Sequence, residues 1–507
     1  MVKQRIYAFA LAYALTFSGL SAARAAELPD LGSPADAALS QSKEDQLGRS
    51  VLLQLRNAGV IINDPQLTEY INLIGSKLAS QANNGQHTFH FFIINDNDIN
   101  AQALPGGYIA VNSGLILATD SENELAAVLA HEISHVTQRH IARAIYDQQK
   151  TSVMSIATML AAIVLGAAAH DNGNAAEGLL AASQAASMQH QINFTRANET
   201  EADAVGIRLM DAAGFDPNAM AGFFEKLQRR YGAEAAQIPA ILQDHPVTER
   251  RIADARARAR QLPPVTHTNS IGYELAKARL EVLQAPTPEQ ALKIFRNKRD
   301  PNTPANRYGL ALSEMGLGLN DKAERAFSGL ATQFPAVIAY RIGKAEALMG
   351  SGATKHAMAV YADSTKLFPR NVPLTISYGE ALIKAGRPAQ AHKLLLDLLN
   401  NVTPTPQQIQ LMARAANAAG DIANAHDYMA EYYVSIGNLP LAMNQLRMAL
   451  ESPDLQSVDR ARFKARLKEL ASYMPKREHR RRGGSSGRDG HGGDQGGEGD
   501  GDGDGLF

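Results

Sequence analysis

The sequence of 507 residues contains no cysteine. This absence excludes disulfide bonds, thiolate zinc sites, iron–sulfur clusters and cysteine nucleophiles. Any metal that the chain binds must therefore be held by histidine and carboxylate side chains. The chain also lacks an excess of either charge, because 50 Lys and Arg residues oppose 51 Asp and Glu residues. Such a balance is not typical of a dedicated nucleic-acid-binding protein, and we expect no nucleic acid among its partners.

The first 25 residues have the layout of a secretory signal peptide. Lys3 and Arg5 form a positively charged start, a short apolar stretch follows, and a small-x-small cleavage site ends at Ala25. The apolar stretch is short for a membrane span, so we expect cleavage after Ala25 rather than an uncleaved anchor. No cysteine follows this site, which excludes a lipoprotein anchor. An exported chain without cysteine fits the bacterial periplasm.

A metal-binding motif lies within residues 121–143, which are predicted to form a helix. His131 and His135 are four residues apart, so they lie about 40° apart on one helix face and can bind one metal ion. Glu132 lies beside that face, where it can take a proton from a zinc-bound water and deliver it to the leaving amine. A continuous helix would place His140 about 140° further round, so we interpret it as a structural histidine. The alternative, a pair of solvated helix histidines, is disfavoured by the apolar residues around the motif.

A second acidic segment offers the third protein ligand that a catalytic zinc requires. Residues 195–203 read TRANETEAD and contain Glu199, Glu201 and Asp203. Spacing alone does not choose among these three carboxylates. A solvated acidic helix face is the alternative interpretation.

The segments HEISH and NETEAD together resemble the membrane-linked gluzincins, the family that includes the CAAX prenyl proteases and heat-shock protease X. The resemblance implies that Glu199 is the third zinc ligand and that Asp203 orients a zinc-binding histidine. A downstream H-P-x-x-x-x-R pattern falls on His245 and Arg251. The resemblance implies that His245 caps the zinc or stabilises the oxyanion, and that Arg251 supports the site. A helix-flanking role for His245 is the alternative.

The same family has an N-A-x-A-x-P-G-G strand, which this chain matches from residue 100 to residue 107. In the family, this strand is thought to pair with an extended substrate. Gln102 stands where an aromatic residue is common. The residues implied to bind substrate are Asn100, Ala101, Pro105, Gly106 and Gly107.

The chain divides into a signal peptide (1–25), a metalloprotease domain (26–264), a repeat domain (265–475) and a tail (476–507). The expected fold is mainly α, with a small β-sheet in a zincin-type protease domain that carries HExxH. Strand-like runs at 87–95 and 108–112 supply that sheet. The tail is basic at its start and then rich in Gly and Asp, so we expect it to be disordered.

The repeat domain has a period of 34 residues. Gly318, Gly352, Gly386 and Gly420 are each 34 apart, and small and bulky residues follow in phase. This is the tetratricopeptide signature, which predicts an α-solenoid of stacked helix pairs. Such solenoids present concave surfaces, so we expect this half of the chain to bind protein.

Residues 153–169 form an apolar stretch that needs a separate interpretation. As a helix it would be about 25 Å long, shorter than a hydrocarbon core of roughly 30 Å. We therefore favour a hairpin that acts as a lid or contacts a membrane peripherally over a membrane span. Together with His245, such a lid would keep the site latent until a partner moves it.

With a signal peptide in front and repeats behind, the arrangement resembles the periplasmic β-barrel assembly-enhancing proteases of Gram-negative bacteria. The resemblance implies a metalloendopeptidase with one Zn²⁺ that degrades misfolded or stalled outer-membrane proteins. It also implies a chaperone-like role in outer-membrane protein assembly and quality control, with the repeats contacting the assembly machinery. The alternative is mainly a tetratricopeptide chaperone or adaptor with latent peptidase activity.

Overall fold

The computed structural model describes residues 39–82, 88–147, 160–162, 196–231, 238–453 and 455–474. The expected signal peptide, the tail and all but residues 160–162 of the apolar stretch lie outside these ranges. Among the described residues, no helix combines the length and the apolar character needed to cross a membrane.

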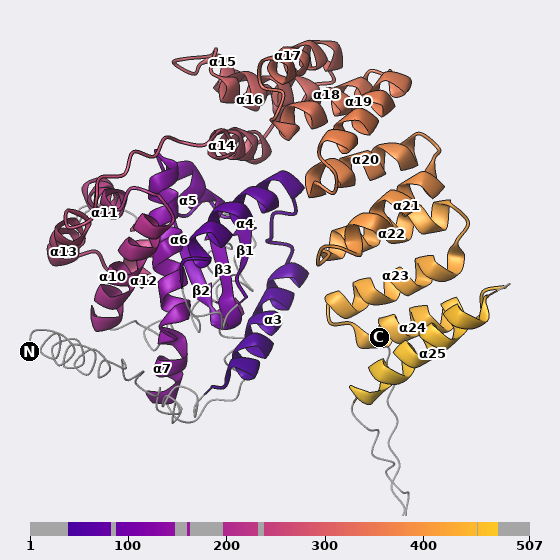
Figure 1. Cartoon of the computed structure of the whole chain (residues 1–507), viewed down its shortest axis with the longest axis horizontal. Helices are drawn as coiled ribbons and strands as arrows, with labels where there is room; N and C mark the ends of the chain where they lie inside the picture. The colour runs from indigo at the N-terminus through magenta and orange to yellow at the C-terminus, as the bar shows by residue number, and fades with distance from the viewer. Residues whose placement is uncertain are drawn as a thin grey trace, which may run out of the picture.

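The N-terminal half surrounds a small sheet with helices (Figure 1). Its elements are α3 (Gln41–Asn57), α4 (Pro65–Ala79), β1 (His90–Ile94), β2 (Ala101–Leu104), the 3-10 turn η1 (Pro105–Gly107), β3 (Tyr108–Asn112), α5 (Ser113–Ala118), α6 (Glu122–Thr137), α7 (His140–Asp147), α10 (Arg196–Ala212), α11 (Asn218–Arg230), α12 (Ala240–Asp244) and α13 (Glu249–Ala259). The expected mainly α fold with a small sheet is confirmed.

The sheet has the strand order β1-β3-β2. β1 runs parallel to β3 with Phe92 opposite Ala110, and β2 runs antiparallel to β3 with Ala103 opposite Ile109. All five residues of β3 are buried, as expected of a central strand. β2 therefore forms one edge of the sheet, and this edge packs against α6.

Helix α6 is the central element of this half, in contact with α4, α10, α11 and β2. Leu125, Leu129 and Ile133 are fully buried and anchor it in the core. Its N-cap is Ser121, whose hydroxyl accepts the N–H of Glu124. The carboxylate of Glu124 accepts the N–H of Asp120 and not that of Ser121, so only one of the two hydrogen bonds of a capping box forms.

The predicted continuous helix over 121–143 is wrong. Helix α6 ends at Thr137, and Arg139 has a φ of 53° before α7 begins at His140. A left-handed residue cannot continue a right-handed helix, so the chain changes direction here. His140 therefore does not lie on the same helix as His131 and His135, and the expected 140° rotation from their face does not apply.

The C-terminal half is the expected solenoid of helix pairs. Its helices are α14 (Ile271–Gln284), α15 (Pro288–Arg296), α16 (Pro304–Gly316), α17 (Asn320–Gln333), α18 (Ile338–Gly350), α19 (Thr354–Leu367), α20 (Val372–Lys384), α21 (Pro388–Leu399), α22 (Pro406–Ala418), α23 (Ile422–Ser435), α24 (Leu439–Leu450) and α25 (Ser457–Ser472). The four in-phase glycines have φ between 71° and 84° just after α16, α18, α20 and α22. Glycine is needed there because other residues are strained in that conformation.

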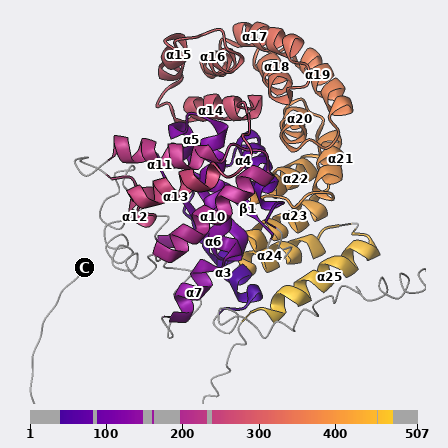
Figure 2. The same ribbon diagram turned by 60° about the vertical axis from the view of Figure 1, so that its left-hand side comes forward.

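The solenoid curves around the N-terminal half, so that α4 lies on its inner side (Figure 2). Asp64, the N-cap of α4, pairs with Arg279 of α14 at 2.7 Å. Further along α4, Glu69 accepts a hydrogen bond of 2.7 Å from the amide of Asn371. Polar contacts thus tie α4 to two separate positions along the solenoid.

Candidate metal centre

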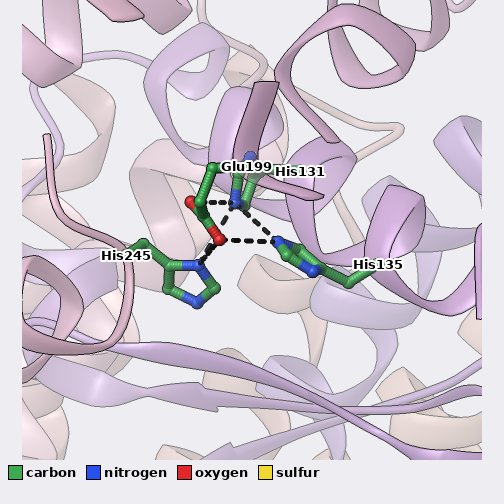
Figure 3. Close-up of side chains that lie close together, drawn as sticks. All are labelled: His131, His135, Glu199 and His245. Carbon is green, nitrogen blue, oxygen red and sulfur yellow. Dashed lines mark hydrogen bonds and ion pairs between the residues drawn. The ribbon is translucent and has the colours of Figure 1, made fainter. Parts of the chain in front are cut away.

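Four buried side chains from three segments converge at one point (Figure 3). His131 and His135 come from α6, Glu199 from α10, and His245 directly follows α12. One ligand atom of each residue lies within 4.8 Å of the others. The Nε2 atoms of His131 and His135 are 2.9 Å apart, and each is 3.5 Å from an oxygen of Glu199. Nδ1 of His245 is 3.0 Å from Glu199 and 3.4 Å from Nε2 of His131.

The donor set fits a divalent metal ion. Imidazole nitrogens and a carboxylate oxygen are common ligands of zinc and of several other first-row metals. Ligand atoms around a tetrahedral zinc stand about 3.3 Å apart, because each is roughly 2.0–2.1 Å from the ion. The five separations given above, 2.9–3.5 Å, are close to that spacing, and the full set of ligand atoms lies within 4.8 Å.

Asp203 and Arg251 contact residues of the cluster without belonging to it. Asp203 lies 3.0 Å from Nδ1 of His131, whereas Nε2 of the same ring faces the other residues of the cluster. The Arg251 guanidinium donates two hydrogen bonds of 2.8 Å to the Asp203 carboxylate and lies 2.8 Å from Glu199. This bidentate pairing holds the Asp203 carboxylate in place beside His131.

Burial and neighbouring charges shift the pKa values of the cluster residues in different directions. Burial lowers the pKa of His131, but its hydrogen bonds to Asp203 and Glu199 outweigh this effect and raise the pKa to about 10. Burial and the neighbouring imidazoles hold the pKa of His135 well below its usual value. His245 and His131 lower the pKa of Glu199 against the effect of burial, so it stays ionised. A metal at this point must displace the proton of His131, which makes metal binding weaker in acid.

Glu132 lies beside the cluster without belonging to it. One carboxylate oxygen accepts a 2.7 Å hydrogen bond from the N–H of Ala103 in β2, and the other lies 3.6 Å from Nε2 of His245. Burial raises the pKa of Glu132, which suits a group that accepts a proton. A pocket at this point is lined by Glu132, His131, His245, Arg251 and five apolar side chains, those of Val128, Phe224, Leu227, Ile241 and Val247.

The residues expected to bind substrate lie directly before β2, on β2 and in the turn that follows it. The side-chain amides of Asn100 and Gln102 donate to one oxygen of Asp244, at 3.0 and 3.3 Å. A Cβ on Gly107, whose φ is 81°, would lie 2.4 Å from the carbonyl oxygen of Thr88. The close packing of η1 therefore already accounts for that glycine.

The remaining expected residues of this strand, Ala101, Pro105 and Gly106, are buried. A Cβ on Gly106, at a φ of 74°, would lie within 3 Å of the backbone of α3. Packing of the turn against α3 thus also explains Gly106. The substrate-binding role of the strand stays a prediction.

The sequence interpretation missed the environment of His140. Its Nδ1 lies 2.9 Å from Nδ1 of His135, and its Nε2 lies 3.1 Å from Glu201. Glu201, one of three candidates for the third ligand, thus lies against His140 and Arg143 and not in the cluster. No glycine or proline near Arg139 signals the helix break that produces this arrangement.

The fold is that of an HExxH zincin-type domain followed by a tetratricopeptide solenoid. Peptidase family M48 matches residues 65–259, and a tetratricopeptide repeat matches residues 348–415. The beta-barrel assembly-enhancing protease of Yersinia pestis is 34% identical over 451 residues, which cover 87% of this chain and 91% of that protein. The chain therefore belongs to peptidase family M48, with the beta-barrel assembly-enhancing proteases.

Two other relatives match over shorter lengths. The beta-barrel assembly-enhancing protease of Escherichia coli K12 is 41% identical over 61% of this chain, and the match spans 63% of that relative. The mitochondrial metalloendopeptidase OMA1 of Schizosaccharomyces pombe is 30% identical over 36% of this chain and 51% of that relative. Membership of this family implies a bound metal, which the buried donor set fits.

Proposed function

We propose that the chain is a zinc-dependent metalloendopeptidase. The observation that carries this proposal is the buried cluster of His131, His135 and Glu199 with Glu132 beside it but outside the ligand set. Two imidazoles and one carboxylate form the protein ligand set of several zinc peptidases and leave a fourth position for water or substrate. We propose one Zn²⁺ with these three residues as its permanent ligands.

Each residue of the site has a distinct task in peptide hydrolysis. Bound zinc supplies Lewis acidity, which polarises the scissile carbonyl and acidifies a water molecule. Glu132 takes the proton of the attacking water and passes it to the leaving amine. Asp203, held by Arg251, keeps His131 in the tautomer that presents Nε2. The edge strand β2 and its flanking residues bind the extended substrate, with Asn100, Ala101, Pro105, Gly106 and Gly107 as the substrate-binding residues.

His245 keeps this site latent. Its Nδ1 lies against Glu199 and His131, so His245 would be the residue to take the fourth ligand position of a bound zinc. Substrate hydrolysis then requires His245 to move, after which its imidazole can stabilise the oxyanion. The relatives named as beta-barrel assembly-enhancing proteases support a periplasmic role in outer-membrane protein assembly. The solenoid supports contacts with assembly proteins, and misfolded or stalled outer-membrane proteins are the proposed substrates.

The variant Glu132→Gln tests the mechanism because it keeps the ligands and removes the proton acceptor. We expect unchanged zinc content and a rate of casein hydrolysis lowered by about 10²–10⁴-fold. Glu249→Gln, which changes the same charge at an exposed position of α13, is the matched control. Hydrolysis at the wild-type rate by zinc-loaded Glu132→Gln would refute the mechanism. Rescue of outer-membrane defects by this variant would instead favour the adaptor function over proteolysis.

A further inference from the structure

The ligand His135 has a different support from the ligand His131. Asp203 contacts Nδ1 of His131 directly, whereas Nδ1 of His135 faces Nδ1 of His140 at 2.9 Å. The other nitrogen of His140 lies 3.1 Å from Oε2 of Glu201. The imidazole of His140 is completely buried, while the Glu201 side chain is 39% exposed.

His135, His140 and Glu201 form a row of three side chains in contact. If His135 is a metal ligand, the positions of the protons along this row follow. A neutral imidazole that offers Nε2 to a metal carries its proton on Nδ1. The Nδ1–H of His135 must then donate to Nδ1 of His140, which has to be an acceptor. His140 therefore carries its own proton on Nε2, and this N–H donates to Glu201. This one assignment makes every contact in the row a hydrogen bond.

We propose that His140 is a positioning residue that, with Glu201 behind it, fixes the tautomer and ring orientation of the metal ligand His135. The proposal rests on the proposed metal site. His140 is not itself a ligand, because its two ring nitrogens lie against His135 and Glu201 and it is not a member of the buried cluster. Metal-bound histidines typically donate their other ring N–H to a hydrogen-bond acceptor. This hydrogen bond fixes the tautomer and the ring orientation of the histidine and increases the affinity of the site for the metal.

The break between α6 and α7 brings the ring of His140 into contact with His135. Arg139 holds the left-handed φ of 53° at the break, which costs conformational energy for a residue with a side chain. Its guanidinium offsets this cost by donating to the carbonyl of Leu39 at 2.5 Å and to the buried carboxylate of Glu44 at 3.1 and 3.2 Å. The ring of His140, the next residue, is thereby directed back to His135.

Two amide variants separate the two hydrogen bonds of His140. In His140→Asn, the side-chain oxygen takes the place of Nδ1 and can still accept from His135, but the chain is too short to reach Glu201. In His140→Gln, the terminal amide takes the place of Nε2, and the acceptor for His135 is lost. If His140 acted through packing alone, His140→Asn would not bind metal more tightly than His140→Gln.

The readout is the zinc affinity of the full chain, measured by competition between Zn²⁺ alone and a chromophoric chelator. We expect His140→Gln to weaken zinc binding by about 10- to 100-fold and His140→Asn to stay within about 3-fold of the wild type. Glu201→Leu changes a partly exposed side chain without altering the core, so it remains informative if His140→Gln fails to fold. It should weaken zinc binding by about 3- to 10-fold, while Glu201→Gln, which keeps an acceptor oxygen, should bind as the wild type does.

The outcomes distinguish this proposal from the proposed function. Wild-type protein that binds zinc tightly, with His140→Gln and Glu201→Leu equally tight, overturns the positioning role and leaves the peptidase proposal intact. Equal weakening by His140→Asn and His140→Gln overturns it as well. Wild-type protein without measurable zinc affinity overturns the proposed function itself.

Discussion

The carboxylate of Glu132 accepts a 2.7 Å hydrogen bond from the backbone N–H of Ala103, which joins α6 to the edge strand β2. The N–H of Ala103 therefore points away from β3 and into the site. The strand proposed to bind substrate and the group proposed to move protons are in direct contact. Substrate that pairs with β2 would meet Glu132 at this point.

The variant Ala103→Pro removes this donor while leaving the carboxylate in place. Proline is tolerated on an edge strand where the N–H does not join the ladder. Loss of a hydrogen bond to a charged group costs about 1.5–3 kcal/mol, so we expect casein hydrolysis to slow by about 10- to 100-fold. Ala103→Ser keeps the N–H and should retain most of the activity. Zinc content should be unchanged in both variants, and an unaffected rate in Ala103→Pro would contradict the role of this contact.

Arg251 neutralises two buried carboxylates, so its removal should destabilise the fold. Arg251→Met leaves Asp203 and Glu199 with His131 as their remaining cationic partner, and removing one member of a buried ion-pair network costs about 3–5 kcal/mol. We expect a loss of this size in the free energy of unfolding, measured by urea denaturation in the presence of a chelator. Arg250→Met, on the exposed side of α13, is the control and should change stability by less than about 0.5 kcal/mol. Equal stability of the two variants would argue against this role.

Asp244 attaches the segment before His245 to the edge strand. It accepts hydrogen bonds from Asn100 and Gln102, and α12 donates to the backbone of Ile99 beside them. If His245 keeps the site latent, Asp244→Ala should release it more easily and raise the rate of casein cleavage by about 5-fold. Asp244→Asn keeps an acceptor oxygen and should have a smaller effect. A folded, zinc-loaded Asp244→Ala variant that is no faster than wild type would count against this attachment as a restraint.

The solenoid has its own pH-dependent element at Asp427 in α23. Burial raises the pKa of its carboxyl from 3.8 to about 6, although Arg462 lies 3.4 Å away. The folded chain therefore holds a proton that the unfolded chain releases between about pH 4 and pH 6. The stabilisation that Asp427 contributes to the folded chain is fully present below about pH 4 and is lost as the pH rises through about 6.

Asp427→Asn removes this titration. We expect the variant to be more stable than wild type at pH 7 by about 1–2 kcal/mol, with the difference shrinking towards pH 4. Urea denaturation at several pH values measures it, with the exposed Asp363→Asn as a control. A variant that is less stable than wild type at pH 7 would mean that the ion pair with Arg462 outweighs burial.

The sequence predicts local patterns well because their physics is local. Four-residue spacing places His131 and His135 on one face of α6, and the 34-residue period marks the glycines with positive φ. Spacing within TRANETEAD could not choose among three carboxylates, and a family resemblance was needed to favour Glu199. The structure places Glu199 in the buried cluster, and its role as a ligand stays a proposal.

Contacts between distant parts of the chain could not be predicted. The helix break at Arg139 depends on Glu44, which is 95 residues away, and so the contact between His140 and His135 was missed. The attachment of Asn100 to Asp244 spans 144 residues. Neither contact has a spacing rule, because tertiary packing brings the partners together.

Helix α4, on the inner side of the solenoid, is in contact with both halves of the chain. Arg279 forms an ion pair and Asn371 a hydrogen bond with side chains of α4 and its N-cap. Helix α4 in turn packs on α6, which carries His131. Contacts thus connect the solenoid to the buried cluster of His131, His135, Glu199 and His245 through one intervening helix, α4.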